Sequence, residues 1–352
     1  MNAVSPSKIG QRLSVDETTV SLRKEGVTTL LTLLLGLLAL ASAFVSLLLG
    51  PSDLHTQEIV AGLFSKHGMA SVIAQQIRLP RAALALFVGG ALGASGAALQ
   101  GLFRNPLAEP GVTGVTSAAG LGAVVAFYFG FAAVHPVLLP TFAIMGALAS
   151  ACILYLLSRA GAGAVALVLG GVAIASLATA LTALALSLSP NPYAMSEIVT
   201  WMMGSLKDRT LSDLAFAVPL VVLGIILLLT AARGLDALIL GEEAAHSLGI
   251  NVHGIRRRVV LGVALATGAA TAAAGAVSFV GLVVPHLLRR FYGHEPARLI
   301  FPSALGAAAL VTAADIAVRL ISPDEKLPLG VLTALLGAPF FVWLILRMRR
   351  DA

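Results

Sequence analysis

The chain has 352 residues, of which 58% are hydrophobic and 11% are charged, and its mean hydropathy is +0.95. Water-soluble domains are about half apolar and a quarter charged, so this chain carries too little charge to cover a soluble surface. The composition predicts an all-α integral membrane protein, whose 35 glycines let helices pack closely. In such a protein the net charge of +6 reflects basic inner loops and gives no reason to expect nucleic acid as a partner.

Uncharged apolar stretches follow one another along most of the chain. They cover residues 27–49, 82–103, 111–134, 136–157, 160–189, 214–232, 259–288, 299–314 and 327–346. The stretch 259–288 would form a helix about 45 Å long, at 1.5 Å per residue, whereas the hydrocarbon core is about 30 Å thick. Gly275 lies near its middle, and a break there gives two spans. The sequence then predicts about ten transmembrane helices.

The arginines on both sides of the long stretch support this break. Segments 233–258 and 289–298 carry four and three arginines, and the positive-inside rule places both in the cytoplasm. An even number of spans must therefore separate them. Ten spans then place both termini on the cytoplasmic side.

Outside the spans, the polar residues 1–26 are interpreted as a cytoplasmic N-terminal tail, and residues 27–349 as a single transmembrane domain. The first apolar run has no small-residue cleavage pattern behind it, so we expect no cleaved signal peptide. Segments 50–81 and 190–211 show helical periodicity on the outer side. They predict short amphipathic helices at the outer interface.

The chain shows no signature of catalysis, nucleotide binding or metal binding. The patterns GxxxxGK[ST], HExxH and GxSxG are missing, and the single cysteine, Cys152, excludes an intrachain disulfide and a cysteine cluster. We therefore expect a protein that is not an enzyme and has no metal site. His286 follows Pro285 at an inner helix end, where packing at the helix end is favoured and a metal or proton role is the alternative.

The cytoplasmic loop 233–258 contains an apolar and acidic segment with helical spacing. Its apolar residues are Leu238, Ile239, Leu240, Ala244, Ala245 and Leu248, around Gly241, Glu242 and Glu243, and Gly249 offers a C-terminal stop. A short helix of this kind at the membrane face favours a protein partner. Resting on lipid is the alternative, but Glu242 and Glu243 would then face anionic headgroups.

Three arginines are predicted on the outer side, where the positive-inside rule expects few basic residues. Arg78 and Arg81 bracket the start of a span, and Arg319 stands four residues beyond Asp315. On their own they favour a simple interpretation, in which Arg319 pairs with Asp315 while Arg78 and Arg81 reach the lipid headgroups.

Taken together, the chain resembles the FecCD family of permeases, the membrane subunits of type II ABC importers for ferric siderophores, haem and cobalamin. The resemblance covers most of the chain. It rests on RLPR (78–81), GAALQGLFRNPLAEPGVTGVTSAAGLGA (96–123), WMMGSL (201–206), LGEEAAHSLGI (240–250), FVGLVVPHLLRR (279–290), AADIAVRL (313–320) and LPLGVLTALLGAPFFVWLI (327–345).

The resemblance implies a type II ABC importer permease fold of ten spans in a bacterial inner membrane. It also implies a homodimer with two cytoplasmic ATPase subunits, which use the ATP, and a periplasmic substrate-binding protein. Residues 236–250 would be the ATPase-coupling segment, with Leu240, Gly241, Glu242, Glu243, Ala244, Ala245, Leu248 and Gly249 as its contacts. Arg78, Arg81 and Arg319 would receive acidic residues of the binding protein.

Within this family an iron chelate, a ferric siderophore or haem, is favoured as substrate, and cobalamin is the alternative. No cofactor is expected on the permease itself. Two other classes stay open on the sequence. An ion-coupled secondary transporter would need ionisable groups at mid-membrane, where only Asp315 is a candidate, near one end of a span. A membrane-embedded enzyme would need convergent polar groups, which the sequence does not show.

Overall fold

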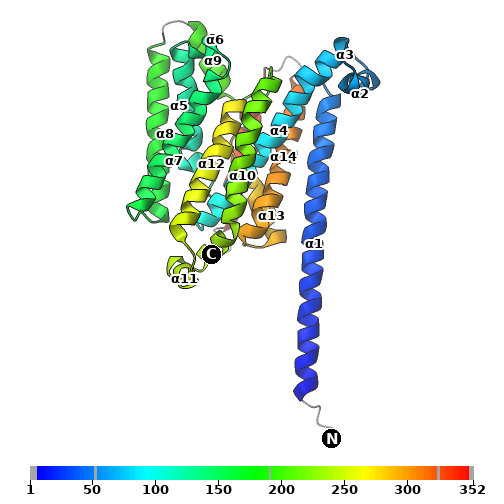
Figure 1. The fold of residues 1–352 in the computed structure, drawn as a ribbon, viewed down its shortest axis with the longest axis vertical. Coiled ribbons are helices and arrows are strands. Elements are labelled where there is room, and N and C mark those ends of the chain that lie inside the picture. The colour runs from blue at the N-terminus through cyan, green and yellow to red at the C-terminus, as the bar shows by residue number, and fades with distance from the viewer. Residues whose placement is uncertain (1–5, 51–53, 190–191, 323–325, 349–352) are drawn as a thin grey trace.

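The chain folds into a bundle of helices that stand side by side (Figure 1). The computed structural model describes residues 6–50, 54–189, 192–322 and 326–348, and these ranges contain helices and no β-strand. Ten helices occupy the ten expected spans. They are α1 (Pro6–Leu48), α4 (Leu79–Leu102), α5 (Val115–Tyr128), α7 (Leu138–Arg159), α8 (Ala164–Ser187), α10 (Leu211–Ile239), α12 (Val252–Ala274), α13 (Val280–Tyr292), α14 (Pro296–Ile321) and α15 (Leu329–Met348). The fold class is therefore confirmed.

The other helices of the described ranges are short. They are α2 (Thr56–Phe64), α3 (Met69–Val72), the π-helical η1 (Ile73–Arg78), the 3-10 helix η2 (Pro110–Thr113), α6 (Phe131–Val134), α9 (Pro192–Met202) and α11 (Glu242–Ser247). Figure 1 places α2, α3, α6 and α9 at one end, which we call the outer end, and α11 at the other, the inner end. Helices are thus confirmed in both outer segments, and residues 51–53 and 190–191 of those segments lie outside the described ranges.

The predicted break in the long apolar stretch is confirmed. Helix α12 ends at Ala274, and Gly275 has a φ of 69°, which favours glycine. A Cβ at Gly275 would lie 2.3 Å from the carbonyl oxygen of Trp201, so a larger residue does not fit there. The Ser205 N–H donates to the Ala274 carbonyl at 2.8 Å, which satisfies one of the acceptors at the end of the helix.

Because of this break, the two arginine-rich segments meet at the inner end of the bundle. The Ala297 N–H donates to the Asp236 carboxylate at 2.9 Å and so links segment 289–298 to segment 233–258. This confirms that an even number of spans separates the two segments.

Two spans differ in extent from the expectation. The expected stretch 111–134 is divided into η2, α5 and α6 by Gly114 and Gly130, both with a φ of 73°. Helix α1 begins at Pro6, because no proline interrupts the chain between there and Leu48. The predicted tail therefore continues the first span as one helix of about 64 Å, at 1.5 Å per residue. Residues 1–5 of the tail and residue 349 of the predicted domain lie outside the described ranges.

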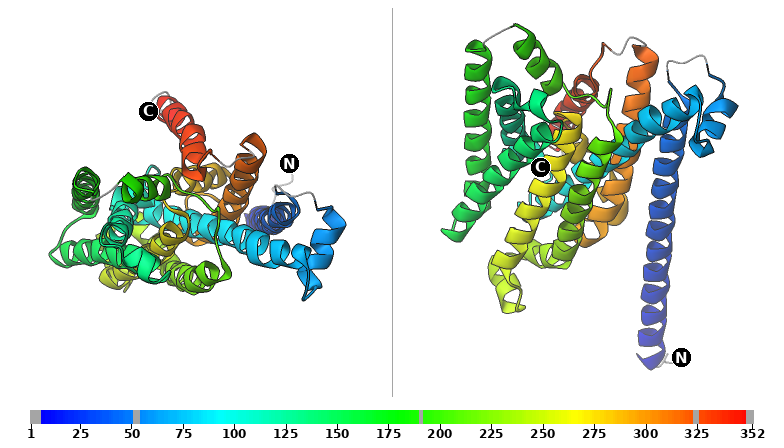
Figure 2. Two further views of the ribbon diagram at one scale, coloured as in Figure 1. Left: turned by 90° about the horizontal axis from the view of Figure 1, so that it is seen from above. Right: turned by 45° about the horizontal axis from the view of Figure 1, so that its top comes forward.

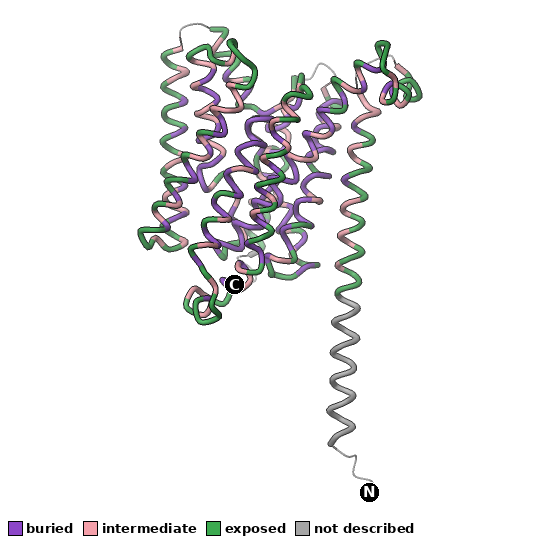
Figure 3. The backbone as a smooth tube through the Cα atoms, in the orientation of Figure 1, coloured by how far each residue is buried: buried purple, intermediate pink, exposed green. Residues whose placement is uncertain are grey.

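Helices α4 and α12 form the centre of the bundle, as the burial colours of Figure 3 show. In their most apolar segments 83% and 78% of the residues are buried, against 11% in α1 and 17% in α8. Figure 2, seen from above, shows α15 on the outside of the bundle, where it contacts α13 and α14. The exposed sides of α1, α8 and α15 are thus the surfaces available to lipid or to another protein.

Close packing of the central helices depends on glycine. Gly96 of α4 lies against Gly281 of α13, and a Cβ on Gly96 would come within 1.8 Å of the Gly281 carbonyl oxygen. Small residues let two helix backbones approach in this way where no water drives their association.

Candidate functional site

Helix α11 is the candidate coupling site at the inner end of the bundle. Gly241 before it and Gly249 after it have φ values of 107° and 76°, so both turns use conformations that favour glycine. The Ile250 N–H donates to the Ala245 carbonyl at 3.0 Å and the Gly249 N–H to the His246 carbonyl at 2.9 Å, a pattern that ends a helix at glycine. The expected short helix with a glycine stop is therefore present.

The side chains of this segment divide into two groups. Leu240 and Leu248 are 69% and 63% exposed, and both are therefore available to a partner. Ala245 is fully buried in the core, and the expectation that it would contact a partner is wrong. The helical spacing identified an apolar face, but part of that face packs on the permease itself.

The acidic residues of the segment also have different surroundings. Glu242 pairs with Arg256 of α12, whose side chain is buried. This ion pair fastens the start of α11 to the bundle. Glu243 is exposed. The candidate coupling segment thus exposes Leu240, Glu243 and Leu248 in and around α11, and the ion pair of Glu242 holds the start of the helix against α12.

At the outer end, two of the three arginines meet around one carboxylate. Arg81 of α4 donates through Nη2 to Asp315 at 2.9 Å, and Arg319 of α14 lies 3.0 Å from the other oxygen of Asp315. Asp315 is 1% exposed, and this burial strengthens both pairs. The expected pairing of Arg319 with Asp315 is confirmed.

Two of the three arginines also hold the end of α1. Arg78 donates to the carbonyl of Leu47 at 3.0 Å, and Arg319 donates to the carbonyl of Leu49 at 2.7 Å. These carbonyls lie in the last turn of α1 and beyond it, where the helix dipole is negative and attracts cations.

The three arginine side chains are therefore not exposed at this surface. Arg78, Arg81 and Arg319 are only 5–8% exposed, so they do not form an exposed positive patch. Arg78 and Arg81 lie in η1 and α4. Their partners lie at the end of α1 and in α14, which are far from η1 and α4 in the sequence. The simple interpretation placed Arg78 and Arg81 among the lipid headgroups. It does not describe their contacts either.

His286 lies against an aromatic ring of α15. Its ring centroid is 6.4 Å from that of Phe340, in an edge-to-face arrangement. Among the described residues, no group of three or more His, Cys, Asp or Glu side chains is close enough to hold a metal ion. The contact agrees with the packing interpretation of His286.

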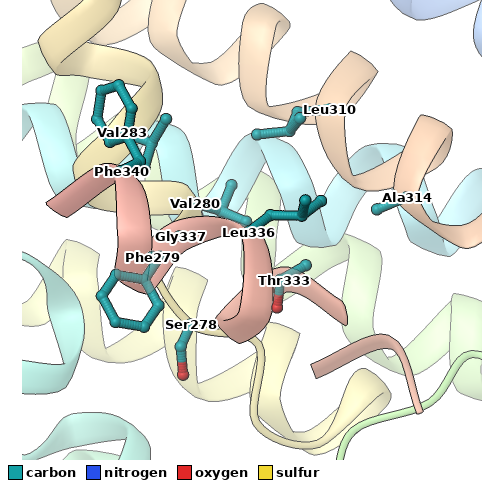
Figure 4. Close-up of a pocket in the computed structure, with 10 residues that line it drawn as sticks. All are labelled: Ser278, Phe279, Val280, Val283, Leu310, Ala314, Thr333, Leu336, Gly337 and Phe340. Atoms are coloured by element: carbon teal, nitrogen blue, oxygen red, sulfur yellow. The ribbon is translucent and has the colours of Figure 1, made fainter. Parts of the chain in front are cut away.

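An apolar cavity of 160 Å³ lies beside the helix break, between α13, α14 and α15 (Figure 4). Phe279, Leu336 and Phe340 contribute most of its large side chains, and Ser278 and Thr333 add two hydroxyl groups. It has no charged side chain in its lining. The cavity therefore offers no ligand set for a metal and no counter-charge for an ion.

Sequence reasoning missed the residues of the re-entrant segment between α4 and α5. Glu109 is half-buried there, and its carboxylate accepts a hydrogen bond from the backbone N–H of Phe279 at the start of α13. A lone acidic residue between two apolar stretches, in the string NPLAEPG, was the available signal.

The bundle, its glycine-packed centre and the helix presented at its inner end define a multi-pass membrane permease. The sequence pattern of the FecCD transport family matches residues 37–347. The chain belongs to this FecCD transport family, whose members are permease subunits of ABC importers. Membership of this family excludes the two other classes, an ion-coupled secondary transporter and a membrane-embedded enzyme.

Several known relatives cover most of the chain. It is 42% identical to the hemin transport system permease protein HmuU of Yersinia pestis, over 78% of this chain and 83% of that protein. It is 39% identical to the Fe(3+) dicitrate transport system permease protein FecD of Escherichia coli (strain K12), over 79% of this chain and 86% of that protein. The cobalamin import system permease protein BtuC of Halobacterium salinarum is 39% identical, over 78% of this chain and 74% of that protein.

A solved structure is similar to the whole bundle. It is described as a metal-chelate type ABC transporter in an inward-facing conformation, and it superposes with a TM-score of 0.79 at 31% sequence identity. The similarity covers 90% of this chain and 99% of that one.

Proposed function

We propose that this permease carries a bulky iron chelate, a ferric siderophore or haem, from the periplasm to the cytoplasm when partner ATPases hydrolyse ATP. Helix α11 carries the proposal, because it presents two exposed leucines on a rigid turn at the inner end. The relatives named for hemin and ferric dicitrate support an iron chelate. Cobalamin is the second candidate, supported by the relative named for cobalamin import.

Transport assays with the reconstituted importer separate the substrates. Proteoliposomes that contain the permease, its ATPase and its binding protein are loaded with ATP and supplied with labelled haem, ferric siderophore or cobalamin. We expect ATP-dependent uptake of an iron chelate. Uptake of cobalamin alone would contradict our choice of substrate, and uptake that is independent of ATP would contradict the proposed mechanism.

The proposed assembly contains two copies of the permease, two ATPase subunits and one binding protein. The exposed apolar faces of α8 and α15 support a second copy, since each helix packs on the bundle along one side only. In that assembly the pathway follows the dimer axis. We propose that the permease binds no cofactor and that the ATP is bound by its partners.

For the outer arginines, docking of the binding protein stays a prediction that rests on the family resemblance. Arg81 and Arg319 share the carboxylate of Asp315, whereas Arg78 donates to backbone carbonyls at the end of α1. Three cationic side chains at one end favour an acidic partner. Direct ion pairs with the partner require the guanidinium groups to leave their present contacts on α1 and α14.

The proposed topology places the inner end in the cytoplasm of a bacterial inner-membrane protein, with both termini on that side. It predicts that His253→Cys, in a Cys152→Ala background, reacts with a membrane-impermeant maleimide only after the cells are opened. His67→Cys, an exposed position near α3, should react in intact spheroplasts. Seven arginines at the inner end are the reason for this orientation. The reverse labelling pattern would refute the topology.

The coupling role predicts a strong effect of Leu248→Arg. This change places a charge where the partner groove expects an apolar side chain, and burying an unpaired charge costs several kcal/mol. We expect ATPase association and uptake to fall at least about tenfold. The exposed leucine should leave permease stability unchanged when it is replaced. Co-purification of the ATPase and thermal unfolding of the permease measure the two effects.

Two further variants make this test specific. Ala245→Arg should destabilise the permease itself, since Ala245 is fully buried. Leu211→Arg, an exposed leucine at the outer end, should leave ATPase association unchanged. Normal ATPase association of the Leu248→Arg protein would remove α11 as the coupling helix.

A further inference from the structure

A recess with basic side chains lies at the inner end of the bundle, between α4, α10, α13 and α14. Its volume is 280 Å³. The polar residues that line it are Gln100, Arg104, Asn105, Arg289 and His294, and no carboxylate is among the lining residues. Proline and aliphatic side chains form the rest of the wall and keep the local dielectric low.

Arg104 occupies a backbone position that favours glycine. Its φ is +48°, and it follows the end of α4, where the Asn105 N–H donates to the Gln100 carbonyl at 3.2 Å. Glycine is the usual residue at this position of a helix stop, because it adopts the left-handed conformation without steric cost. An arginine at such a strained position suggests a role for its side chain, which is exposed and lines the recess.

Arg289 brings a second guanidinium group to the same recess. Its Nη2–H donates to Gln100 Oε1 at 2.6 Å, whereas its Nε is buried without a hydrogen-bond partner among the described residues. Gln100 is a neutral partner, so it does not compensate the charge of the arginine. Two arginines that share one recess repel each other, and an anion between them would remove that repulsion.

The carboxylates nearest to Arg104 and Arg289 in the sequence have other partners. Glu109 accepts a hydrogen bond from the Phe279 N–H. Glu295 pairs with Arg298 at 2.7 Å, and Asp236 accepts the Ala297 N–H at the start of α14. Among the described residues, none of these carboxylates lines the recess, so an anion from outside the chain can compensate Arg104 and Arg289 there.

We propose that this recess is a binding site for an oxyanion of the phosphate class. Guanidinium groups present paired N–H donors that match phosphate oxygens, and the low-dielectric wall strengthens the attraction. His294 and Asn105 line the same recess and supply further polar contacts. The phosphate belongs either to the headgroup of an anionic phospholipid or to a free anion of the cytoplasm.

The test compares two arginine variants with a matched control in the full-length protein. Arg104→Gly and Arg289→Gln each remove one cation of the recess. Arg290→Gln removes the neighbouring arginine, which stacks on the ring of Phe291 and does not line the recess. Arg104→Gly should fold at least as stably as the wild type, because glycine suits its backbone. Loss of binding in this variant therefore cannot come from unfolding.

Two probes distinguish the sources of the phosphate. Equilibrium binding of radiolabelled inorganic phosphate to the permease in neutral detergent tests a free anion. Mass spectrometry of lipid retained from nanodiscs of equal phosphatidylglycerol and phosphatidylcholine content tests a headgroup. We expect one of the two to depend on the recess, with affinity or retention lower by at least about tenfold in Arg104→Gly and Arg289→Gln and unchanged in Arg290→Gln.

Three outcomes would overturn the proposal. The first is binding by Arg104→Gly that equals the wild type with both probes. The second is an equal loss in Arg290→Gln, which would indicate a response to net charge alone. The third is an effect of Arg104→Gly on ATPase association without an effect on either probe, which would make the recess a contact for an acidic protein surface.

Discussion

Replacing Asp315 by Asn should destabilise this permease by about 3–5 kcal/mol, the usual cost of removing one partner from a buried ion pair. Asp315 is 1% exposed and compensates Arg81 and Arg319, which are both buried as well. Asparagine keeps the size of the side chain but not its charge, so two guanidinium groups would lose their attraction to the Asp315 carboxylate. Thermal unfolding in detergent, followed by size-exclusion chromatography, measures the change.

The control for this prediction is an ion pair at the surface. Glu295→Gln breaks the pair with Arg298, whose members are 55% and 52% exposed, and it should cost no more than about 1 kcal/mol. Adding Arg81→Gln to Asp315→Asn should recover part of the loss, since it removes one of the uncompensated charges. If Asp315→Asn were as mild as Glu295→Gln, the network would contribute little to stability and α1 would be held by other contacts.

The second large effect is expected from Gly96→Ala. Its Cβ would come within 1.8 Å of the Gly281 carbonyl oxygen, and both groups belong to helix backbones that cannot rotate away. Overpacking usually costs about 1–3 kcal/mol, and backbone contact on both sides places this variant at about 3 kcal/mol or above. We expect a lower unfolding temperature and loss of uptake, because α4 and α13 would be forced apart.

Gly120→Ala provides the matched control on a neighbouring helix. Gly120 lies inside α5, and a Cβ there would meet no atom within 4 Å. Alanine is the better helix former, so this variant should be neutral or more stable by up to about 1 kcal/mol. Equal stability of the Gly96→Ala and Gly120→Ala proteins would contradict the close approach of α4 and α13.

The sequence by itself determined the number of spans, the break at Gly275 and the common location of the two arginine-rich segments. These features follow from local quantities, namely the length of an apolar run, the thickness of a bilayer and the charge at the ends of each run. The glycine stop of α11 at Gly249 was also predicted correctly, because a left-handed turn at the end of a short helix depends on the residue that occupies it.

Only the tertiary structure decided which faces of these elements are free. Arg319 donates hydrogen bonds to the hydroxyl of Ser46 and to carbonyls at the end of α1. Arg319 and Ser46 lie 273 positions apart, and no periodicity in the sequence indicates this contact. Helical spacing grouped Ala245 with Leu248, but the packing of α11 on the bundle buries the first and leaves the second exposed. Burial depends on neighbours that the fold brings from distant segments, and for that reason the arginine network, the inward side of α11 and the basic recess could not be predicted from the sequence.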